Sequence, residues 1–478
     1  MNLKAQTGQK RLADYKSERP FMSKQMRRLI PVVFLLALVA LTVVVAGPAL
    51  ARVPQNTAVA ASTTRNAAIV ATSVEVLKET SDLRELEILR PVKSGAQSRT
   101  EIERMIVKNL DEQTTPAEMR ATELTLKKLG LAPPDFQYRA FLVKLLTEQV
   151  AGYYDPKAQQ FYLADWIELE GQKPVMAHEL THALQDQHFN LRRFEKWSKS
   201  DSDARLAAHA LIEGDATLAM TLYMAKNPLV ALAFIRSIGG TNMSSVQFKQ
   251  APRALRESLV FPYEQGSEWA TKVYKRGGWS MVSQAYTKLP QSTEQILHPE
   301  KYFSFEEPIK VDLPDVRTHL GPLWKKISYD INGEWGYYLM LDQFLNAPAE
   351  SKRAVAGWGG DRYVVYKGPK AGDVFIAQLS TWDSENDARE FLDAYAKRTW
   401  RRYPGAKPTE ITSAQQSNGN TEFHSWQTDE GGVVVELRGS RVLTVEGIPK
   451  NADSRAFMKA LWQPVVRPEP FGRKLQGN

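Results

Sequence analysis

Two histidines four residues apart, with a glutamate directly after the first, are the residues of this sequence best suited to chemistry. His178, Glu179 and His182 lie in segment 174–185, where every residue after the opening proline is compatible with a helix. On such a helix the two imidazoles share one face and can bind one Zn²⁺ ion. Glu179 lies about 100° round the helix from His178, so it can reach a metal-bound water without ligating the metal. This H-E-x-x-H pattern predicts a zinc hydrolase with Glu179 as general base.

Chance is a poor explanation of this pattern. The alternative is a pair of surface histidines with a solvated acid between them. Only 7 histidines occur among the 478 residues, so an accidental H-E-x-x-H is rare. The functional interpretation is therefore favoured.

A third ligand is expected on a later helix. The chain contains no cysteine, so any metal must be held by histidines and carboxylates. Segment 203–224 has helical composition, and Glu213 would be an unpaired carboxylate within it, at a cost that a metal ion would relieve. Glu213 is the predicted third ligand. Gly214 beside it permits a neighbouring helix to approach closely.

Five further side chains are candidates for other roles at this site. His209 lies one turn before the predicted carboxylate ligand and is the main alternative to it. Asp215 and Thr217 can orient an imidazole by hydrogen bonding. Tyr263 and His298 can each stabilise an oxyanion opposite the metal, although a hydrogen-bonded structural role is the simpler expectation for both.

The basic charge of the chain does not indicate nucleic-acid binding. The net charge is +8, but residues 1–51 contribute +6, which leaves +2 for residues 52–478. Nucleic-acid-binding proteins usually carry a concentrated basic face, and the remainder of this sequence has none. We therefore expect no nucleic-acid partner.

The N-terminal residues 1–51 resemble an export signal. Arg27 and Arg28 precede an apolar run over residues 29–46, and small residues follow, with an A-x-A cleavage site that ends at Ala51. The apolar run just reaches membrane-spanning length, so an uncleaved membrane anchor is the alternative. Either way the chain is expected outside the cytoplasm, in the periplasm or the extracellular space.

The sequence divides the remaining chain into several parts. Residues 52–82 are expected to be a flexible linker because their first part is rich in Ala, Thr, Ser and Asn. Residues 83–345 form the predicted catalytic domain, with a strand near 83–92, helices that begin after Ser98 and Thr115, and a hairpin over residues 151–163 just before the histidine helix. An extended peptide can pair with the edge of such a hairpin, although a purely structural hairpin is an equal alternative.

The C-terminal part is expected to be a separate domain. Residues 346–358 are the predicted linker, residues 359–465 a small α+β domain, and residues 466–478 a tail. Strand-like and helical patterns alternate in this domain, and no catalytic constellation occurs in it. The predicted strands cover residues 363–366, 374–379, 432–437 and 441–445, and the predicted helices begin at Ser384 and near Asp453.

The site segments resemble a known class of enzymes. The H-E-x-x-H pair with a glutamate on a later helix resembles the gluzincin class of zinc metallopeptidases. Segments 152–156, 183–188 and 213–217 are similar to a poorly characterised bacterial group of exported metallopeptidases, over about residues 85–345. The resemblance implies zinc held by His178, His182 and Glu213, with Glu179 as the base. The 30 residues between His182 and Glu213 exceed the gap in thermolysin-like enzymes.

These observations predict an α+β protein in which a mostly helical, zincin-like metallopeptidase domain precedes a small α+β sandwich domain. The expected activity is zinc-dependent endopeptidase cleavage of a polypeptide substrate at the cell envelope or outside the cell. Two alternatives remain at this point: a non-catalytic zinc-binding envelope protein whose C-terminal domain binds a partner, and a zinc amidase that acts on the cell wall. The sequence makes no prediction of oligomeric state.

Overall fold

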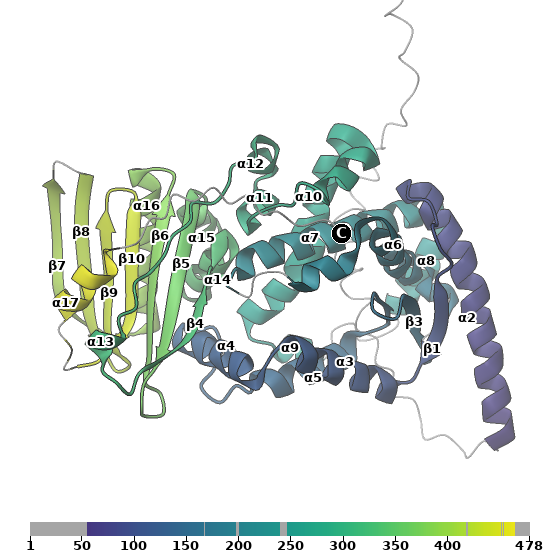
Figure 1. Cartoon of the computed structure of the whole chain (residues 1–478), viewed down its shortest axis with the longest axis horizontal. Coiled ribbons are helices and arrows are strands. Elements are labelled where there is room, and N and C mark those ends of the chain that lie inside the picture. Colours follow the sequence, from purple (N-terminus) through teal and green to yellow (C-terminus); the bar gives the residue numbers. More distant parts are fainter. Residues whose placement is uncertain are drawn as a thin grey trace, which may run out of the picture.

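A helical part and a sheet part lie side by side in the protein (Figure 1). The computed structural model describes residues 55–463 apart from Ile167 and residues 197–199, 240–245, 417–418, 451 and 453. The expected mixture of helices with a separate sheet domain is confirmed. The predicted export segment with its apolar run 29–46, and the tail 466–478, lie outside the described residues.

The helical part surrounds a small three-stranded sheet. Its strands are β1 (Lys93–Gln97), β2 (Gly152–Asp155) and β3 (Gln160–Ala164), in the order β1-β3-β2. Its helices are α2 (Gln55–Arg84), α3 (Arg99–Gln113), α4 (Pro116–Lys128), α5 (Tyr138–Gln149), η1 (Glu170–Gln172), α6 (Lys173–Phe189), η2 (Leu191–Lys196), α7 (Ser202–Lys226), α8 (Pro228–Gly239), α9 (Val246–Gln250), α10 (Arg253–Ala285), α11 (Thr293–Leu297) and α12 (Pro299–Ser304). Helix α13 (Arg317–Leu320) lies with the sheet part, where its His319 contacts Phe457.

Local sequence signals explain several of these elements. Ser98 and Thr115 each form a complete capping box with a glutamate three residues later, as predicted. The predicted hairpin is confirmed: β2 and β3 pair antiparallel, and β2 is an edge strand of the small sheet. A turn over residues 133–137 precedes the third helix of the region, which begins at Tyr138.

The expectation of a flexible linker over residues 52–82 is wrong. Helix α2 runs from Gln55 to Arg84, along the outside of the helical part (Figure 1). It buries Ile69, Val76 and Leu77 against β3 and α6. Val76 and Leu77 lie seven and eight residues after Ile69, so all three share one helix face. The small polar residues between them make this apolar spacing hard to recognise in the sequence. The strand predicted near residues 83–92 is also absent, and the chain enters β1 only at Lys93.

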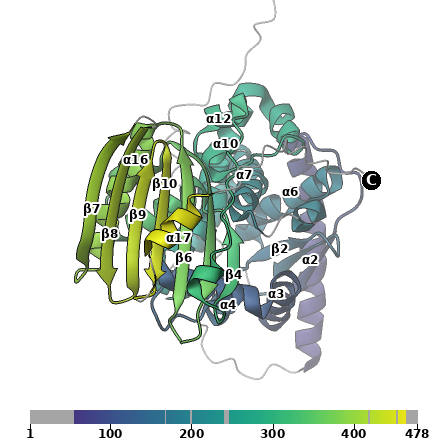
Figure 2. The ribbon, with the colours of Figure 1, turned by 60° about the vertical axis from the view of Figure 1, so that its left-hand side comes forward.

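The sheet domain is built on seven antiparallel strands in the order β4-β5-β6-β10-β9-β8-β7. Figure 2 shows α17 across one face of this sheet and α16 on the other. The elements are β4 (Lys325–Asp330), α14 (Gly333–Leu345), α15 (Pro348–Val355), β5 (Trp358–Lys367), β6 (Val374–Trp382), α16 (Glu385–Arg402), β7 (Lys407–Gln416), β8 (Gly419–Thr428), β9 (Gly431–Arg438), β10 (Arg441–Ile448) and α17 (Ser454–Leu461).

The predicted domain boundary at residues 346–358 is wrong. Most of that segment is helix α15, and strand β4 already belongs to the large sheet. Helix α14 packs its Tyr337 against Phe391 of α16, so it belongs to the core of the sheet domain. The sequence did not predict strands β4, β7 and β8. These strands are largely polar and half-exposed, and they lie at or near the edges of the sheet.

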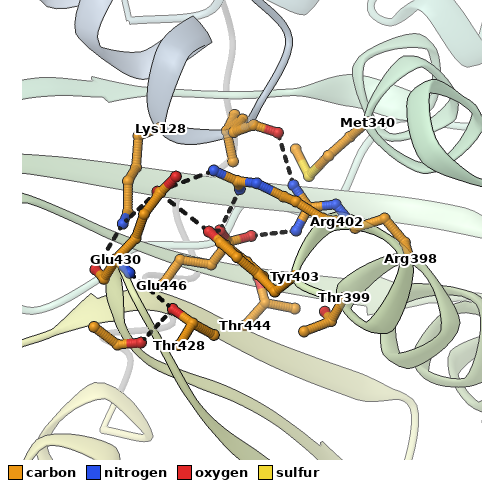
Figure 3. Close-up of polar contacts among 12 residues, drawn as sticks. Lys128, Met340, Arg398, Thr399, Arg402, Tyr403, Thr428, Glu430, Thr444 and Glu446 are labelled. Carbon is orange, nitrogen blue, oxygen red and sulfur yellow. Dashed lines mark hydrogen bonds and ion pairs between the residues drawn. The ribbon is translucent and has the colours of Figure 1, made fainter. Parts of the chain in front are cut away.

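A buried charge cluster joins the two parts (Figure 3). Glu446 of β10 is fully buried and accepts hydrogen bonds from Arg398 and Arg402 of α16. Arg398 also donates to the carbonyl of Leu129 at the end of α4, at 2.7 Å. Lys128 of α4 pairs with Glu430 at 3.0 Å. Because these bonds cross from a helix of the first part to the sheet, they fix how the two parts are packed.

Among the described residues, no single helix has both the length and the apolar character needed to cross a membrane. Helices α7 and α8 reach this length and apolar character only when they are taken together, and a bend of 113° separates them.

Candidate metal centre

Helices α6 and α7 provide the predicted ligands. Helix α6 has Pro174 in its first turn and ends at Asn190, which adopts the left-handed conformation that closes many helices. Helix α7 begins after the capping residue Asp201 and continues without interruption through Glu213 and Gly214. The two helices pack against each other, and His178, His182 and Glu213 are each only 8% exposed.

The three predicted ligands meet at one point. The Nε2 atoms of His178 and His182 are 3.2 Å apart, and the nearest Glu213 oxygen lies 3.1 Å from the first and 3.4 Å from the second. Zinc binds nitrogen and oxygen ligands at about 2.0–2.1 Å in tetrahedral geometry, which separates neighbouring ligand atoms by about 3.3 Å. The triangle of ligand atoms therefore has the dimensions that a zinc ion requires, and three protein ligands leave a fourth position open.

Gln185 determines which nitrogen of His182 faces this triangle. Its amide oxygen lies 2.8 Å from Nδ1 of His182, so Nδ1 must carry a proton and Nε2 is the atom available to a metal. In the metal-free chain burial opposes the imidazolium, but the Glu213 carboxylate outweighs it and raises the pKa of His182 to about 9. Metal binding would therefore displace the proton that His182 shares with Glu213.

A buried chain of polar groups stands behind Gln185. Its amide nitrogen donates to Asp215 at 3.0 Å and to the carbonyl of Ile212 at 3.1 Å, which fixes the orientation of the amide. Asp215 also accepts from Arg84 at 2.6 and 3.1 Å and from Tyr286 at 2.9 Å. Arg84 and Asp215 are both fully buried. Asp215 thus orients an imidazole as expected, but it does so through Gln185.

Glu179 lies beside the triangle without joining it. Its carboxylate accepts the backbone N–H of Tyr154 at 3.0 Å, so the edge strand β2 holds the side chain in place. Desolvation raises the pKa of Glu179, although the charges of His178 and His182 act to lower it. A carboxylate with a raised pKa is suited to accept and return a proton near neutral pH.

The same arrangement lowers the pKa of Glu213. Burial alone would raise it, but the charge of His182 and hydrogen bonds from His178, His182 and His209 hold it well below its usual range. Nε2 of His209 lies 3.1 Å from the second oxygen of Glu213. His209 therefore positions the carboxylate, while the first oxygen faces the two histidines.

Helix α10 brings Tyr263 to the site through an unusually close crossing with α7. A Cβ atom on Gly214 would lie 2.2 Å from the carbonyl oxygen of Gly266, and one on Gly266 would lie 2.2 Å from that of Ala210. Only glycine fits at both positions. One turn before Gly266, Tyr263 stacks beside His178 with ring centroids 6.1 Å apart. Burial and the nearby Glu213 and Glu179 charges hold the pKa of Tyr263 well above its usual value, so its hydroxyl keeps its proton.

The structure does not bring the remaining candidates to the triangle. The hydroxyl of Thr217 is buried and has no hydrogen-bond partner among the described residues. His298 contacts Glu334 at 2.9 Å, between α11 and α14, and has a structural role there. A second acidic group, formed by Glu294, Glu306 and Asp383, surrounds the ammonium of Lys301 at 2.6, 3.0 and 2.7 Å and so already contains its cation.

Three groups that contribute to the site were not predicted from the sequence. Gln185 is three residues after His182 on the same helix, a spacing that could have suggested a contact. Arg84 lies in a segment that was expected to be a strand but is the last turn of α2, so no signal pointed to its contact with Asp215. The backbone N–H of Tyr154 became relevant only through the packing of β2 beside α6.

Comparison with known proteins gave a match that covers the sheet domain. A domain of unknown function, DUF8575, matches residues 321–458. The DUF8575 match begins just before β4 and ends within α17, so it agrees with the boundary seen in the structure. It does not include the triangle of ligands. No curated protein and no solved structure matched the chain.

Proposed function

We propose that the protein is a zinc-dependent endopeptidase. The observation that carries this proposal is the triangle of His178, His182 and Glu213 with Glu179 beside it. A purely structural zinc site closes its coordination with four protein ligands and does not need an adjacent base, whereas a catalytic site keeps one position open. When bound, zinc would supply Lewis acidity, which polarises a carbonyl group and makes a water molecule more acidic.

The residues of the chain have distinct roles in this proposal. Glu179 takes the proton from the attacking water and returns it to the leaving amine nitrogen. The protonated hydroxyl of Tyr263 donates a hydrogen bond to the oxygen that becomes negative as the carbonyl is attacked. His209 and Gln185 hold Glu213 and His182 in position, so that these groups need little reorganisation during the reaction.

Strand β2 is the proposed platform for the substrate. It forms one edge of the small sheet, and its Tyr154 is linked directly to Glu179. A polypeptide can add to this edge as a further strand through main-chain hydrogen bonds. Such binding places a peptide bond beside the catalytic carboxylate and accounts for a preference for internal bonds of a chain.

The Glu179→Gln variant tests the proposal. We expect it to fold and to retain stoichiometric zinc, measured by elemental analysis, while hydrolysis of casein falls by at least about 10³-fold because the base is lost. Thr221→Val, which removes a hydroxyl bonded only to its own helix at Thr217, is a control. Full activity of Glu179→Gln would contradict the mechanism. Parallel assays on peptidoglycan test whether the hydrolysed amide belongs to the cell wall.

We also propose that the protein acts outside the cytoplasm, as the charged and apolar pattern of residues 1–51 indicates. Sequencing the N-terminus of the mature protein tests this. A first residue near Arg52 supports cleavage and export, and retention of residues 29–46 supports an anchor. A cytoplasmic protein that begins at Met1 would contradict both.

A further inference from the structure

A cleft lies where the helical part meets the sheet domain. Its volume is about 600 Å³, within the range of ligand-binding pockets. Its walls come from α3, α4 and α5 on one side, from the first turns of α7 and α10 on another, and from α14 and strand β4. Many of its side chains are aliphatic, among them Leu110, Leu126, Leu142, Leu255, Ile327 and Leu339.

Among the described residues that line this cleft, Arg205 is the one arginine or lysine, and the carboxylates are Glu118 and Asp330. It is exposed, and it donates to the hydroxyl of Ser202 at 3.1 Å. No carboxylate of the described residues forms an ion pair with it. The nearby Asp330 accepts the backbone N–H groups of Ser202 and Ile331 on one oxygen, at 2.8 and 2.9 Å, and the hydroxyl of Ser202 on the other. Arg205 therefore has guanidinium donors available for an anionic group in the cleft.

Helix α7 connects the cleft, which Arg205 lines, with the candidate metal centre, to which it contributes Glu213. Arg205, His209 and Glu213 are spaced four residues apart, so they lie on one face of the helix. His209 is 52% exposed and contacts Glu213. The rise of a helix places Arg205 about 12 Å from Glu213 along the axis.

Helix α10 lies beside α7 over the same distance. Gly266 touches Gly214 beside the metal ligand, while Ser258 lines the cleft with Arg205. The two helices therefore run side by side in the same direction between the cleft and the metal centre. An extended peptide rises about 3.3 Å per residue, so about 12 Å corresponds to roughly four residues.

We propose that this cleft is an extended substrate subsite in which Arg205 binds a carboxylate three to five residues from the cleaved bond. The inference rests on the proposed function and adds a substrate class to it: polypeptides with an aliphatic segment followed by an acidic side chain or the chain terminus. The aliphatic walls bury the segment between the cleaved bond and the carboxylate, and the guanidinium donates paired hydrogen bonds to the carboxylate.

Cleavage-site sequencing tests the inference. Zinc-loaded wild type, Arg205→Gln and Arg205→Glu are incubated with casein and with a tryptic digest of an unrelated protein mixture, and the products are identified by mass spectrometry. For wild type we expect Asp or Glu to be enriched at least about threefold at one position three to five residues from the cut. Arg205→Gln should lose this enrichment, and Arg205→Glu should replace it with Lys or Arg. Peptides with amidated ends show whether the terminal carboxylate serves equally well.

Lys226→Glu is the matched control, because it reverses a charge in the last turn of the same helix, far from the cleft. It should leave the cleavage profile unchanged, and all variants should hold equal zinc. If wild type and Arg205→Glu cut at the same sites, the subsite assignment is overturned while the proposed peptidase activity stands. If zinc-loaded wild type cleaves none of these substrates, both the activity and the subsite are overturned.

Discussion

Gln185 accepts a hydrogen bond from Nδ1 of His182 at 2.8 Å, while its own amide nitrogen is committed to Asp215 and Ile212. The amide cannot turn round without losing both of its donor bonds. The imidazole is therefore held with Nε2 toward His178 and Glu213. The geometry of the candidate metal centre thus depends on a residue that cannot itself bind the metal tightly.

The Gln185→Leu variant should weaken zinc binding. Loss of a group that orients a metal-ligating histidine typically costs 10- to 100-fold in metal affinity, and we expect a change of this order. Competition with a chromophoric zinc chelator measures it. Gln187→Leu, two residues further along α6, removes bonds only to the backbone of Leu89 and Arg90 and should leave zinc affinity unchanged. Equal affinity of Gln185→Leu and wild type would show that His182 needs no such support.

The Arg84→Met variant should destabilise the helical part strongly. Arg84 and Asp215 are fully buried, so the substitution leaves a carboxylate without its counter-charge. Breaking a buried pair in this way costs about 3–5 kcal/mol. Urea unfolding in the presence of chelator, followed by circular dichroism, measures the free energy without a contribution from metal binding. Arg139→Met breaks an exposed pair with Asp111 and should cost less than about 1 kcal/mol.

The Gly266→Ala variant should force α7 and α10 apart. The added methyl group would lie 2.2 Å from the carbonyl oxygen of Ala210, and the backbone there cannot turn away as a side chain can. We expect a loss of about 1–3 kcal/mol from overpacking, together with weaker zinc binding, because Glu213 lies on the displaced helix. Thermal unfolding and zinc competition measure the two effects. Gly405→Ala has no atom within 4 Å of its new Cβ and is the control.

The sheet domain should lose stability in acid through Glu446. Burial alone would raise the pKa of this carboxyl, but Arg398 and Arg402 lower it to about 2 from the usual 4.5. Because the folded-state pKa is depressed, the stabilisation is present above pH 4.5 and is lost as the pH falls toward 2. The difference corresponds to about 3 kcal/mol.

Unfolding by urea at pH 5, 4, 3 and 2.5 measures this loss. In the Glu446→Gln variant the decline between pH 5 and 2.5 should be shallower than in wild type, because the titrating group is gone. The Glu350→Gln variant removes a carboxylate from an exposed pair with Lys397, so its decline should follow that of wild type. Parallel curves for Glu446→Gln and wild type would contradict the assignment.

Local sequence was sufficient for features that depend on neighbouring residues. The spacing of His178 and His182 requires a shared helix face, the capping boxes at Ser98 and Thr115 begin their helices, and the run around Asp155 forms the hairpin. In each case the interacting groups lie within a few residues of one another. Their geometry follows from one helical turn or one tight turn, and little tertiary information is needed.

Only the tertiary structure decided the features that depend on distant segments. Glu213 meets the histidines because α7 packs against α6, and Tyr263 lies beside His178 because Gly214 and Gly266 let α7 and α10 cross closely. Arg84 reaches Asp215 across 131 residues of sequence. The start of the sheet domain was misplaced because β4 is largely polar and becomes a strand by pairing with β5. The sequence by itself determined which groups can do chemistry, since that depends on side-chain type and local spacing. Packing decided which of them meet, because long-range contacts depend on the shape of whole elements and not on any local pattern.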